Sequence, residues 1–448
     1  MGISSSMNAG VSGLNANANK LATISDNIAN SQTYGYKRAD VDFASMTVSD
    51  AKSPSTVGGG RWFTAGGVRT NAVWDVQEKG ALAQTNNSTD LAITGRGFLP
   101  VSAVSAIGQP TADMPFMLTT TGSFSTNADG YLTTPSGLVL MGWPADANGV
   151  VGSYPRDTVS GLQPVRVNMS SVAVEPTSQV TLNVNLPTDD VEAGASGDPR
   201  VVTVEYFDNI GGSNTLTATF LPTVPAPGNP RSNEWTLTLT DQATGQSAGD
   251  YTLTFSDVPP NAGGLASVTG PVGGALTSSY DPVTGDLVLD LGNQQITFGL
   301  GSTSATGPQH MSQLSSTFSS VGVSHNGNAA GIYTGLSIDE KGYLQATYSS
   351  GFSKVIYQIP VADMPNPNGL RVLDNQCFAL SQASGSLFLW NAGEGPTGGI
   401  EGFAREQSTT DIANELTQLI QTQRAYSSNA KIIQTVDEML QETTNLKR

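Results

Sequence analysis

The side chains best suited to catalysis or metal binding are few in this sequence. His310 and His325 are the only histidines, and each lies in a stretch rich in Gly, Ser, Gln and Asn. Neither has a second His, a Cys or a carboxylate at the spacing of a metal site, and a zinc site needs three or four ligands. A catalytic imidazole also needs a partner that orients it. We therefore expect both histidines to be ordinary surface or loop residues.

Other reactive groups are equally isolated. Asp189-Asp190, and Asp286 with Asp290, would suit a glycosidase or a calcium site, but neither lies in the regular acidic and glycine-containing loop of an EF-hand. Gly95-Arg96-Gly97 lacks the third glycine of a dinucleotide-binding loop. Cys377 is the only cysteine, so we expect no intramolecular disulfide and a small buried apolar side chain. The sequence thus predicts no catalytic residue, no metal site, no cofactor and no enzyme activity.

Composition also limits the possible partners. The 448 residues include 37 acidic and 20 basic side chains, a formal net charge of −17. Nucleic-acid binding needs clustered Lys and Arg, and the segment Tyr34-Gly35-Tyr36-Lys37-Arg38 has no wider basic patch around it. No run of about 18 apolar residues is present, so we expect no membrane insertion. We also expect no cleavable signal peptide, which by itself favours a cytoplasmic protein, although an export route that does not cleave its cargo would give the same pattern.

The elements that must position any functional surface are clearest at the two ends of the chain. Apolar residues there recur at alternating intervals of four and three, the heptad spacing of a coiled-coil helix, and polar Ser25, Gln423 and Asp437 occupy the remaining positions. Near the N-terminus the apolar residues are Met7, Val11, Leu14, Ala18, Leu21 and Ile28. Near the C-terminus they are Ile412, Leu416, Leu419, Tyr426, Ala430, Ile433 and Leu440, after N-cap candidates in 408–411. An apolar stripe on one helix needs a partner in water, so we expect the two helices to pair as a coiled coil and any uncovered seam to pair with neighbouring subunits.

The middle of the chain has a different period. Segments such as Val201–Tyr206, Thr215–Leu221, Trp235–Leu239 and Tyr251–Phe255 alternate apolar and polar residues, which is typical of half-buried strands. Turn-forming residues separate these segments. The predicted fold class is mainly β with helical termini, in which a discontinuous inner β-domain contains an inserted outer β-domain.

Motifs in both terminal helices resemble one known family. Asp26-Asn27-Ile28-Ala29-Asn30 followed by Thr33-Tyr34-Gly35-Tyr36-Lys37 is similar to the N-terminal signature of the bacterial flagellar rod, hook and hook-associated proteins. Gln423-Arg424-Ala425-Tyr426 with Asn429-Ala430-Lys431 is similar to the C-terminal signature. Within the insertion, Val204-Glu205-Tyr206-Phe207-Asp208 looks like the outer domain of the hook branch, and a distal-rod protein of this family lacks such an insertion.

The resemblance implies a structural subunit of the flagellar hook. Such a subunit leaves the cell through the type III export apparatus, is added beneath a hook cap, and self-assembles into a curved helical tube. That tube is a universal joint that transmits torque from rod to filament. The implied partners are further copies of the chain, the flagellar rod, the hook cap, the hook–filament junction proteins and the export apparatus. The implied location is extracellular, in the basal body and hook of the flagellum.

Pattern and resemblance together divide the chain into six expected segments. They are an N-terminal polymerisation helix (1–40), an extended connector (41–75), the first part of the inner β-domain (76–145), the inserted outer β-domain (146–323), the second part of the inner β-domain (324–402) and a C-terminal polymerisation helix (403–448). The connector is expected to bridge neighbouring subunits and to set bending stiffness.

Two sets of residues are expected to act in assembly. The seam is Val11, Leu14, Leu21, Ile28, Leu416, Leu419, Tyr426, Ala430, Ile433 and Leu440. The polar motif residues are Asn27, Asn30, Gly35, Tyr36, Gln423, Arg424 and Asn429. The polar side chains on the helices either face solvent or form hydrogen bonds between subunits near the channel of the tube. Two other functions stay open: a distal-rod-like axial protein, and a surface adhesin, which would need no heptad seam.

Overall fold

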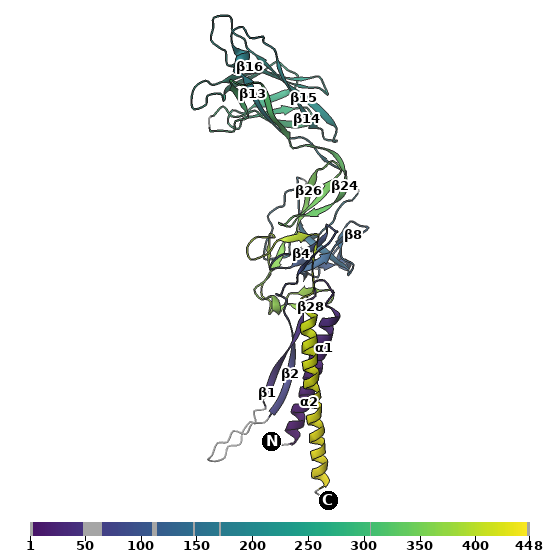
Figure 1. Cartoon of the computed structure of the whole chain (residues 1–448). Coiled ribbons are helices and arrows are strands. Elements are labelled where there is room, and N and C mark those ends of the chain that lie inside the picture. Colours follow the sequence, from purple (N-terminus) through teal and green to yellow (C-terminus); the bar gives the residue numbers. More distant parts are fainter. Residues whose placement is uncertain are drawn as a thin grey trace. The chain divides into compact units, whose positions relative to one another are not determined.

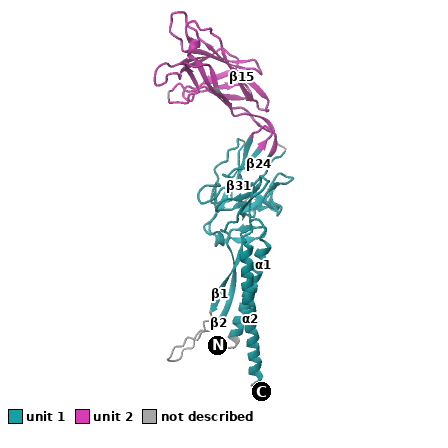
Figure 2. Ribbon diagram, in the orientation of Figure 1, with its two compact units in different colours: residues 1–169, 335–346, 353–448 teal, residues 170–334, 347–352 magenta. Residues whose placement is uncertain are grey.

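The computed structural model describes residues 3–47, 65–109, 114–146, 148–169, 172–304 and 306–445. The chain divides into two compact units (Figure 2). Unit 1 consists of Met1–Met169, Gly335–Ala346 and Ser353–Arg448, and unit 2 of Ser170–Thr334 and Thr347–Phe352. Residues 48–64, part of the expected connector, lie outside the described residues. The finer division into six segments stays a prediction.

Two long helices from opposite ends of the chain belong to unit 1. α1 spans Ile3–Ala29 and α2 spans Ile412–Asn445, and they lie side by side (Figure 1). Asp411 caps α2, because its Oδ1 accepts hydrogen bonds from the backbone N–H groups of Ala413 at 2.9 Å and Asn414 at 3.3 Å. The predicted pairing of the terminal helices is therefore confirmed.

A two-stranded antiparallel sheet packs on α1. β1 (Ala39–Thr47) and β2 (Ala65–Trp74) pair from Ala39 with Trp74 to Thr47 with Ala65. A sheet of two strands is marginally stable alone in water. Both strands contact α1, so helix and sheet stabilise each other.

The rest of unit 1 is a β-domain made of two parts of the chain that flank unit 2 in the sequence. Its first strands are β3 (Leu82–Gln84), β4 (Asp90–Ile93), β5 (Leu99–Ala103), β6 (Met117–Thr119), β7 (Thr121–Ser123), β8 (Ser125–Thr126), β9 (Leu132–Thr133), β10 (Leu138–Pro144) and β11 (Gln163–Pro164). Its later strands are β26 (Ser353–Gln358), β27 (Val361–Asp363), β28 (Arg371–Leu373), β29 (Cys377–Ala379), β30 (Phe388–Trp390), β31 (Ile400–Gly402) and β32 (Ala404–Glu406). Early strands pair with late ones, β6 with β29, β4 with β31 and β3 with β32. The predicted discontinuous inner domain is confirmed.

Unit 2 is a sandwich of two β-sheets around one core. Its strands are β12 (Val172–Glu175), β13 (Gln179–Pro187), β14 (Arg200–Phe207), β15 (Ser213–Pro222), β16 (Glu234–Asp241), β17 (Ser247–Phe255), β18 (Leu265–Val272), β19 (Thr277–Tyr280), β20 (Asp286–Asp290), β21 (Gln295–Gly299), β22 (Met311–Leu314) and β23 (Ser319–His325). β24 (Asn328–Ile338) and β25 (Tyr343–Tyr348) contribute residues to both units.

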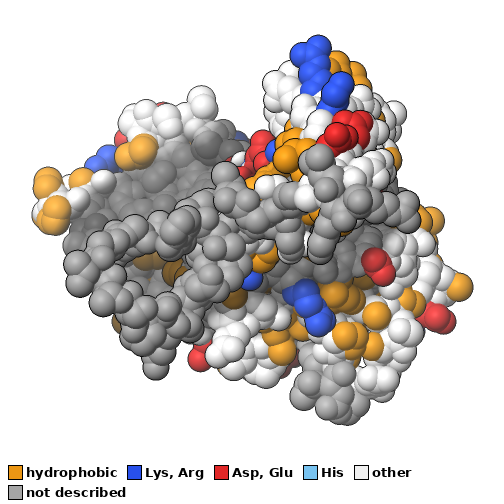
Figure 3. Space-filling view, turned by 90° about the horizontal axis from the view of Figure 1, so that it is seen from below, with side chains coloured by type: hydrophobic (Ala, Val, Ile, Leu, Met, Phe, Trp, Pro, Cys, Tyr) orange, Lys and Arg blue, Asp and Glu red, His pale blue; other side chains and the backbone are white. Residues whose placement is uncertain are grey.

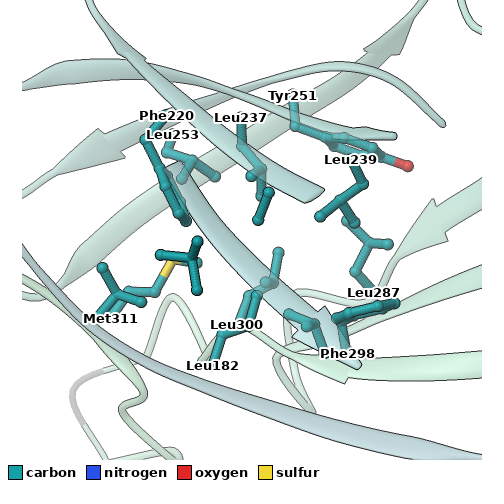
Figure 4. Packing of buried hydrophobic residues seen from close by; sticks show 14 of the residues in the cluster. Leu182, Phe220, Leu237, Leu239, Tyr251, Leu253, Leu287, Phe298, Leu300 and Met311 are labelled. Carbon is teal, nitrogen blue, oxygen red and sulfur yellow. The ribbon is translucent and has the colours of Figure 1, made fainter. Parts of the chain in front are cut away.

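The two sheets of unit 2 share a buried apolar core. One has the order β14-β15-β16-β17-β18, and the other β19-β20-β21-β13-β22 with β23 on β13. Leu182 and Phe298 of the second sheet meet Phe220, Leu237 and Leu253 of the first (Figure 4). The inward residues alternate with outward polar residues, as in face-to-face sheets. The four strands expected from alternation are confirmed as β14, β15, β16 and β17.

Candidate assembly interface

Two glycines bring the terminal helices close together. α1 and α2 run antiparallel, with Gly10 beside Ile433 and Gly13 beside Asn429. A Cβ atom on Gly10 would lie 3.2 Å from Ile433 Cγ1, and one on Gly13 would lie 2.9 Å from Asn429 Nδ2. Larger residues at these positions would push the closely packed helices apart. The contact therefore depends on small residues that the heptad pattern did not single out.

The β1–β2 sheet covers a different flank of α1. Ser12 Oγ accepts a hydrogen bond from the N–H of Val68 at 3.1 Å. One heptad further along, Asn19 Nδ2 donates to Thr70 Oγ1 at 2.9 Å. This flank of α1 is therefore occupied within the chain.

Asn27 joins the end of α1 to the start of β1. Its side chain is fully buried, with 0% exposed. Its Nδ2 donates to the carbonyl of Ala39 at 2.8 Å, and its Oδ1 accepts from the N–H of the same residue at 3.0 Å. Asn27 is therefore neither on a solvated face nor free to bond to another subunit, which differs from both interpretations made from the sequence.

The flank of the helix pair opposite the sheet is open. Gly10 faces α2, and a turn of about 100° per residue brings Val11 and Ser12 to opposite flanks of that contact. Since β2 covers the flank of Ser12, Val11 lies on the open one. On α2, Glu415 is buried, and the next residue, Leu416, is turned away from it by the same angle of about 100°. Because the helices are antiparallel, Leu416 and Val11 lie on the same side of the pair.

Exposed apolar side chains line this open side. Ile412, Leu416 and Ile420 recur every four residues and are 42%, 48% and 52% exposed, so they form a ridge along α2. Met7 and Val11 of α1 are 43% and 40% exposed. The register of Gly10 beside Ile433 and Gly13 beside Asn429 places Met7 and Val11 roughly 20–35 Å along the helix pair from this ridge, so we call only Ile412, Leu416 and Ile420 the open apolar face. An exposed apolar ridge of this kind marks an interaction surface.

The predicted seam residues are divided between the helix contact and the open side. Ile433 packs beside Gly10. The half-buried seam residues are Leu14, Leu21, Ile28, Leu419 and Ala430. The exposed ones are Val11, Leu416, Tyr426 and Leu440. The residues of α2 that are buried, Glu415, Thr422 and Val436, are one position away from the predicted stripe, which leaves part of that stripe uncovered. The role of the seam between subunits stays a prediction.

The polar motif residues are likewise divided. Gln423 and Arg424 are exposed on α2, whereas Asn429 is half-buried against Gly13. Asn30 Nδ2 donates to the backbone carbonyl and the side chain of Asp26, each at 3.0 Å. These contacts cap the end of α1.

Gly35 and Tyr36 form the turn that follows α1. Gly35 has φ +72°, and a Cβ on it would lie 2.7 Å from Thr121 Cγ2, so only glycine fits without strain. The hydroxyl of Tyr36 lies 3.1 Å from Asp26 Oδ2 and 3.1 Å from Asn27 Oδ1. Burial, and then the charge of Asp26, raise the pKa of Tyr36 above its ordinary value. The turn therefore has one fixed conformation beside the helix end.

Two adjacent cations after α1 bind two carboxylates near the start of α2. Lys37 Nζ lies 2.7 Å from Glu406 Oε1, and both side chains are 1% exposed. Arg38 Nε lies 2.5 Å from Oε1 of Glu415, whose side chain is 0% exposed. Glu406 Oε1 also accepts a hydrogen bond from the N–H of Gly80 at 2.8 Å. These pairs tie the ends of both helices to the inner β-domain.

The charge of Lys37 controls the ionisation of Glu406. Burial alone would raise the pKa of Glu406, but Lys37 and Lys79 outweigh burial and hold the pKa below its ordinary value. No pattern in the sequence points to this cluster. Lys37 and Arg38 are adjacent, but their partners are 369 and 377 residues away and no spacing rule links them.

Each histidine has an uncharged polar neighbour at one ring nitrogen. His310 Nδ1 lies 3.2 Å from Asn183 Oδ1, and His325 Nδ1 lies 3.1 Å from the carbonyl of Gly327. Among the described residues, no group of three or more His, Cys, Asp or Glu is placed to hold a metal ion.

The other reactive groups have structural partners. Asp190 binds Arg200 through two hydrogen bonds of 2.8 and 3.0 Å. Arg96 Nε lies 2.6 Å from Asp363 Oδ1. Cys377 is buried, and burial raises the pKa of its thiol to about 11. The two ion pairs and the buried thiol are therefore parts of the folded structure in the described residues.

The face seen in Figure 3 is poor in charge. In Figure 3, hydrophobic side chains lie among mostly uncharged atoms, and charged side chains form small separate groups. None of the helices in the described part of the chain is both long enough and apolar enough to cross a membrane.

Flagellar proteins match both ends of the chain, and flagellar hook proteins match its whole length. Residues 7–37 match the profile of the family "Flagella basal body rod protein", and residues 401–446 match "Flagellar basal body rod FlgEFG protein C-terminal". The flagellar hook protein FlgE of Brucella suis biovar 1 is 33% identical over 99% of this chain and 98% of its own length. FlgE of Rhizobium meliloti is 32% identical over 100% of both chains.

A solved structure is also similar. The crystal structure of the Helicobacter pylori flagellar hook protein FlgE2 matches with a TM-score of 0.47 and 14% identity, over 71% of this chain and 99% of that chain. FlgE of Salmonella typhimurium is 27% identical over 98% of both chains. The sequence identity to full-length relatives shows that this chain belongs to the flagellar hook protein family.

Proposed function

We propose that the chain is the structural subunit of an extracellular flagellar hook and that its copies assemble through the open apolar face. The observation that carries this proposal is the face itself, three exposed apolar side chains in one ridge along α2. Apolar surface of this extent is stabilised when another helix covers it. A face that packs on a different surface of the next copy makes a heterologous contact, and heterologous contacts that do not close produce a helical tube.

The buried ion pairs support a mechanical role. Lys37–Glu406 and Arg38–Glu415 connect the helices to the inner β-domain at the point where both helices meet it. Torque that enters through the helices would therefore pass to the β-domain without deforming this junction. Such a subunit suits a universal joint between rod and filament. Its partners would be the rod, the hook cap, the hook–filament junction proteins and the type III export apparatus.

The proposal is tested by charging the open apolar face in the source bacterium. A strain that lacks its own copy would carry the double variant Leu416→Asp and Ile420→Asp. We expect export of the chain into the medium but no hooks by electron microscopy, because two carboxylates would have to be buried at each contact. Val283→Asp is the matched control, an apolar residue of unit 2 that is 77% exposed, and should leave hooks unchanged. Normal hooks from the double variant would refute the proposal.

A further inference from the structure

A small polar cavity lies in the inner β-domain of unit 1. Its walls come from the turn before β25, the end of β26 and the loop after β30. Its volume of about 210 Å³ is room for about seven water molecules at the density of the liquid. The side chains that matter here are Glu340, Lys341, Tyr343, Gln358, Asn391 and Glu394. The cavity is smaller than the site of a drug-sized molecule and has the size of a single small ring.

The amide of Gln358 has no partner in the wall of this cavity. Gln358 lines the cavity and is only 4% exposed. No described residue forms a hydrogen bond with its side chain. A buried polar group without a hydrogen bond destabilises the fold, and a primary amide can both donate and accept. A molecule in the cavity that also donates and accepts would satisfy it.

Other polar groups at the cavity are also without partners. Tyr343 has a hydroxyl, Lys341 an ammonium and Glu340 a carboxylate, and none of these groups forms an ion pair or hydrogen bond with another described residue. Asn391 donates through Nδ2 to Glu394 Oε2 at 2.9 Å, but its side-chain oxygen accepts nothing from the described part of the chain. The cavity therefore offers donors and acceptors together.

The charges around the cavity balance. Glu394 has a countercharge, because it lies 3.8 Å from Arg156. Glu340 and Lys341 remain, and their charges cancel. A site without net charge does not concentrate ions of either sign. An apolar ligand would leave the polar lining without hydrogen bonds. The ligand class that fits is an uncharged molecule with many hydroxyl groups, because each hydroxyl both donates and accepts.

We propose that this cavity binds one ring of a neutral sugar, with the amide of Gln358 and the hydroxyl of Tyr343 as its main hydrogen-bond partners. The site lies within one copy of the chain, so it goes beyond the proposed function and does not depend on it. A ligand of about twelve non-hydrogen atoms in such a site should have a Kd on the order of 1 mM.

Saturation-transfer NMR of the full-length, unassembled chain tests this proposal. The probes are glucose, galactose, mannose and N-acetylglucosamine. We expect at least one of them to bind, and Gln358→Leu to raise its Kd by roughly tenfold. Leu is similar in size and removes an unpaired buried amide, so this variant should unfold at the same temperature as the unaltered chain or higher. Tyr343→Phe, which removes only a hydroxyl, should raise the Kd by roughly threefold. Gln345→Leu is the matched control, a glutamine of β25 that does not line the cavity, and should keep the affinity.

Three results would overturn the proposal. In the first, none of the four sugars binds the unaltered chain. In the second, a sugar binds Gln358→Leu as tightly as the unaltered chain, which would place the binding elsewhere. In the third, methylguanidinium binds and the sugars do not, which would indicate a cationic side chain of another protein as the occupant. Hook assembly is not measured in this experiment, so the proposed function is tested separately.

Discussion

Replacing Glu406 by Gln should destabilise unit 1 by about 3–5 kcal/mol. Glu406 and Lys37 lie 2.7 Å apart, and each side chain is 1% exposed. Gln keeps the shape of the side chain and an acceptor for the N–H of Gly80. It leaves the ammonium of Lys37 buried without a countercharge, however, and an uncompensated buried charge is the costly part of a broken pair.

Calorimetry of the full-length chain measures this effect. For a unit of this size the loss corresponds to a fall of roughly 6–20 °C in the unfolding midpoint of unit 1. The transition of unit 2 should not move and is an internal reference. Glu394→Gln is the matched control in unit 1, because Glu394 lies 3.8 Å from Arg156 and these side chains are 59% and 44% exposed. An exposed pair contributes at most about 1 kcal/mol.

Two further measurements sharpen this test. The double variant Lys37→Met and Glu406→Leu should recover part of the loss, because Lys37 no longer leaves a buried charge, whereas Lys79 and the N–H of Gly80 still lack the carboxylate. Since the folded pKa of Glu406 lies below its ordinary value, the pair contributes stability above about pH 4.3 and loses it as pH falls through the folded pKa. The gap between the unaltered chain and Glu406→Gln should therefore narrow in acid. Equal midpoints for Glu406→Gln and Glu394→Gln at neutral pH would refute the reasoning.

Two other substitutions and one thiol-labelling assay test contacts within unit 1. Gly13→Val should separate α1 from α2, since its Cβ would lie 2.9 Å from Asn429 Nδ2, and limited proteolysis should release the helices faster than in an Asn15→Val control. Asn27→Ala should cost about 2 kcal/mol in urea unfolding, because it removes both hydrogen bonds to Ala39; an unchanged midpoint would contradict this. Cys377 should react with a thiol reagent only after unfolding, since burial raises the pKa of its thiol to about 11, and prompt reaction of the native chain would show that it is exposed.

The periodic elements were predictable from the sequence because local pattern determines them. The alternation in Trp235–Leu239 reappears as β16, and the terminal heptads reappear as α1 and α2. The two-part inner domain also followed from the sequence, although the pairing of β6 with β29 joins residues far apart in the chain.

The contacts within the helix pair were not predictable from the heptad rule. That rule assumes that large apolar side chains define the contact. Here Gly10 and Gly13 define it, and the buried Glu415 is there because it pairs with Arg38. A polar residue on such a helix normally faces solvent, so the sequence pattern assigns the contact to Leu416. In the structure the buried residue is Glu415, one position earlier. This small rotation leaves Leu416 exposed and creates the open apolar face.

Immunogold electron microscopy of the source cells with antibody to residues 170–334 would locate the chain on the cell. For a hook subunit we expect label confined to a short curved segment between the cell envelope and the filament. Label spread over the general cell surface would contradict it and favour an adhesin. Label accessible only on detergent-extracted basal bodies would also contradict it and would indicate a rod protein.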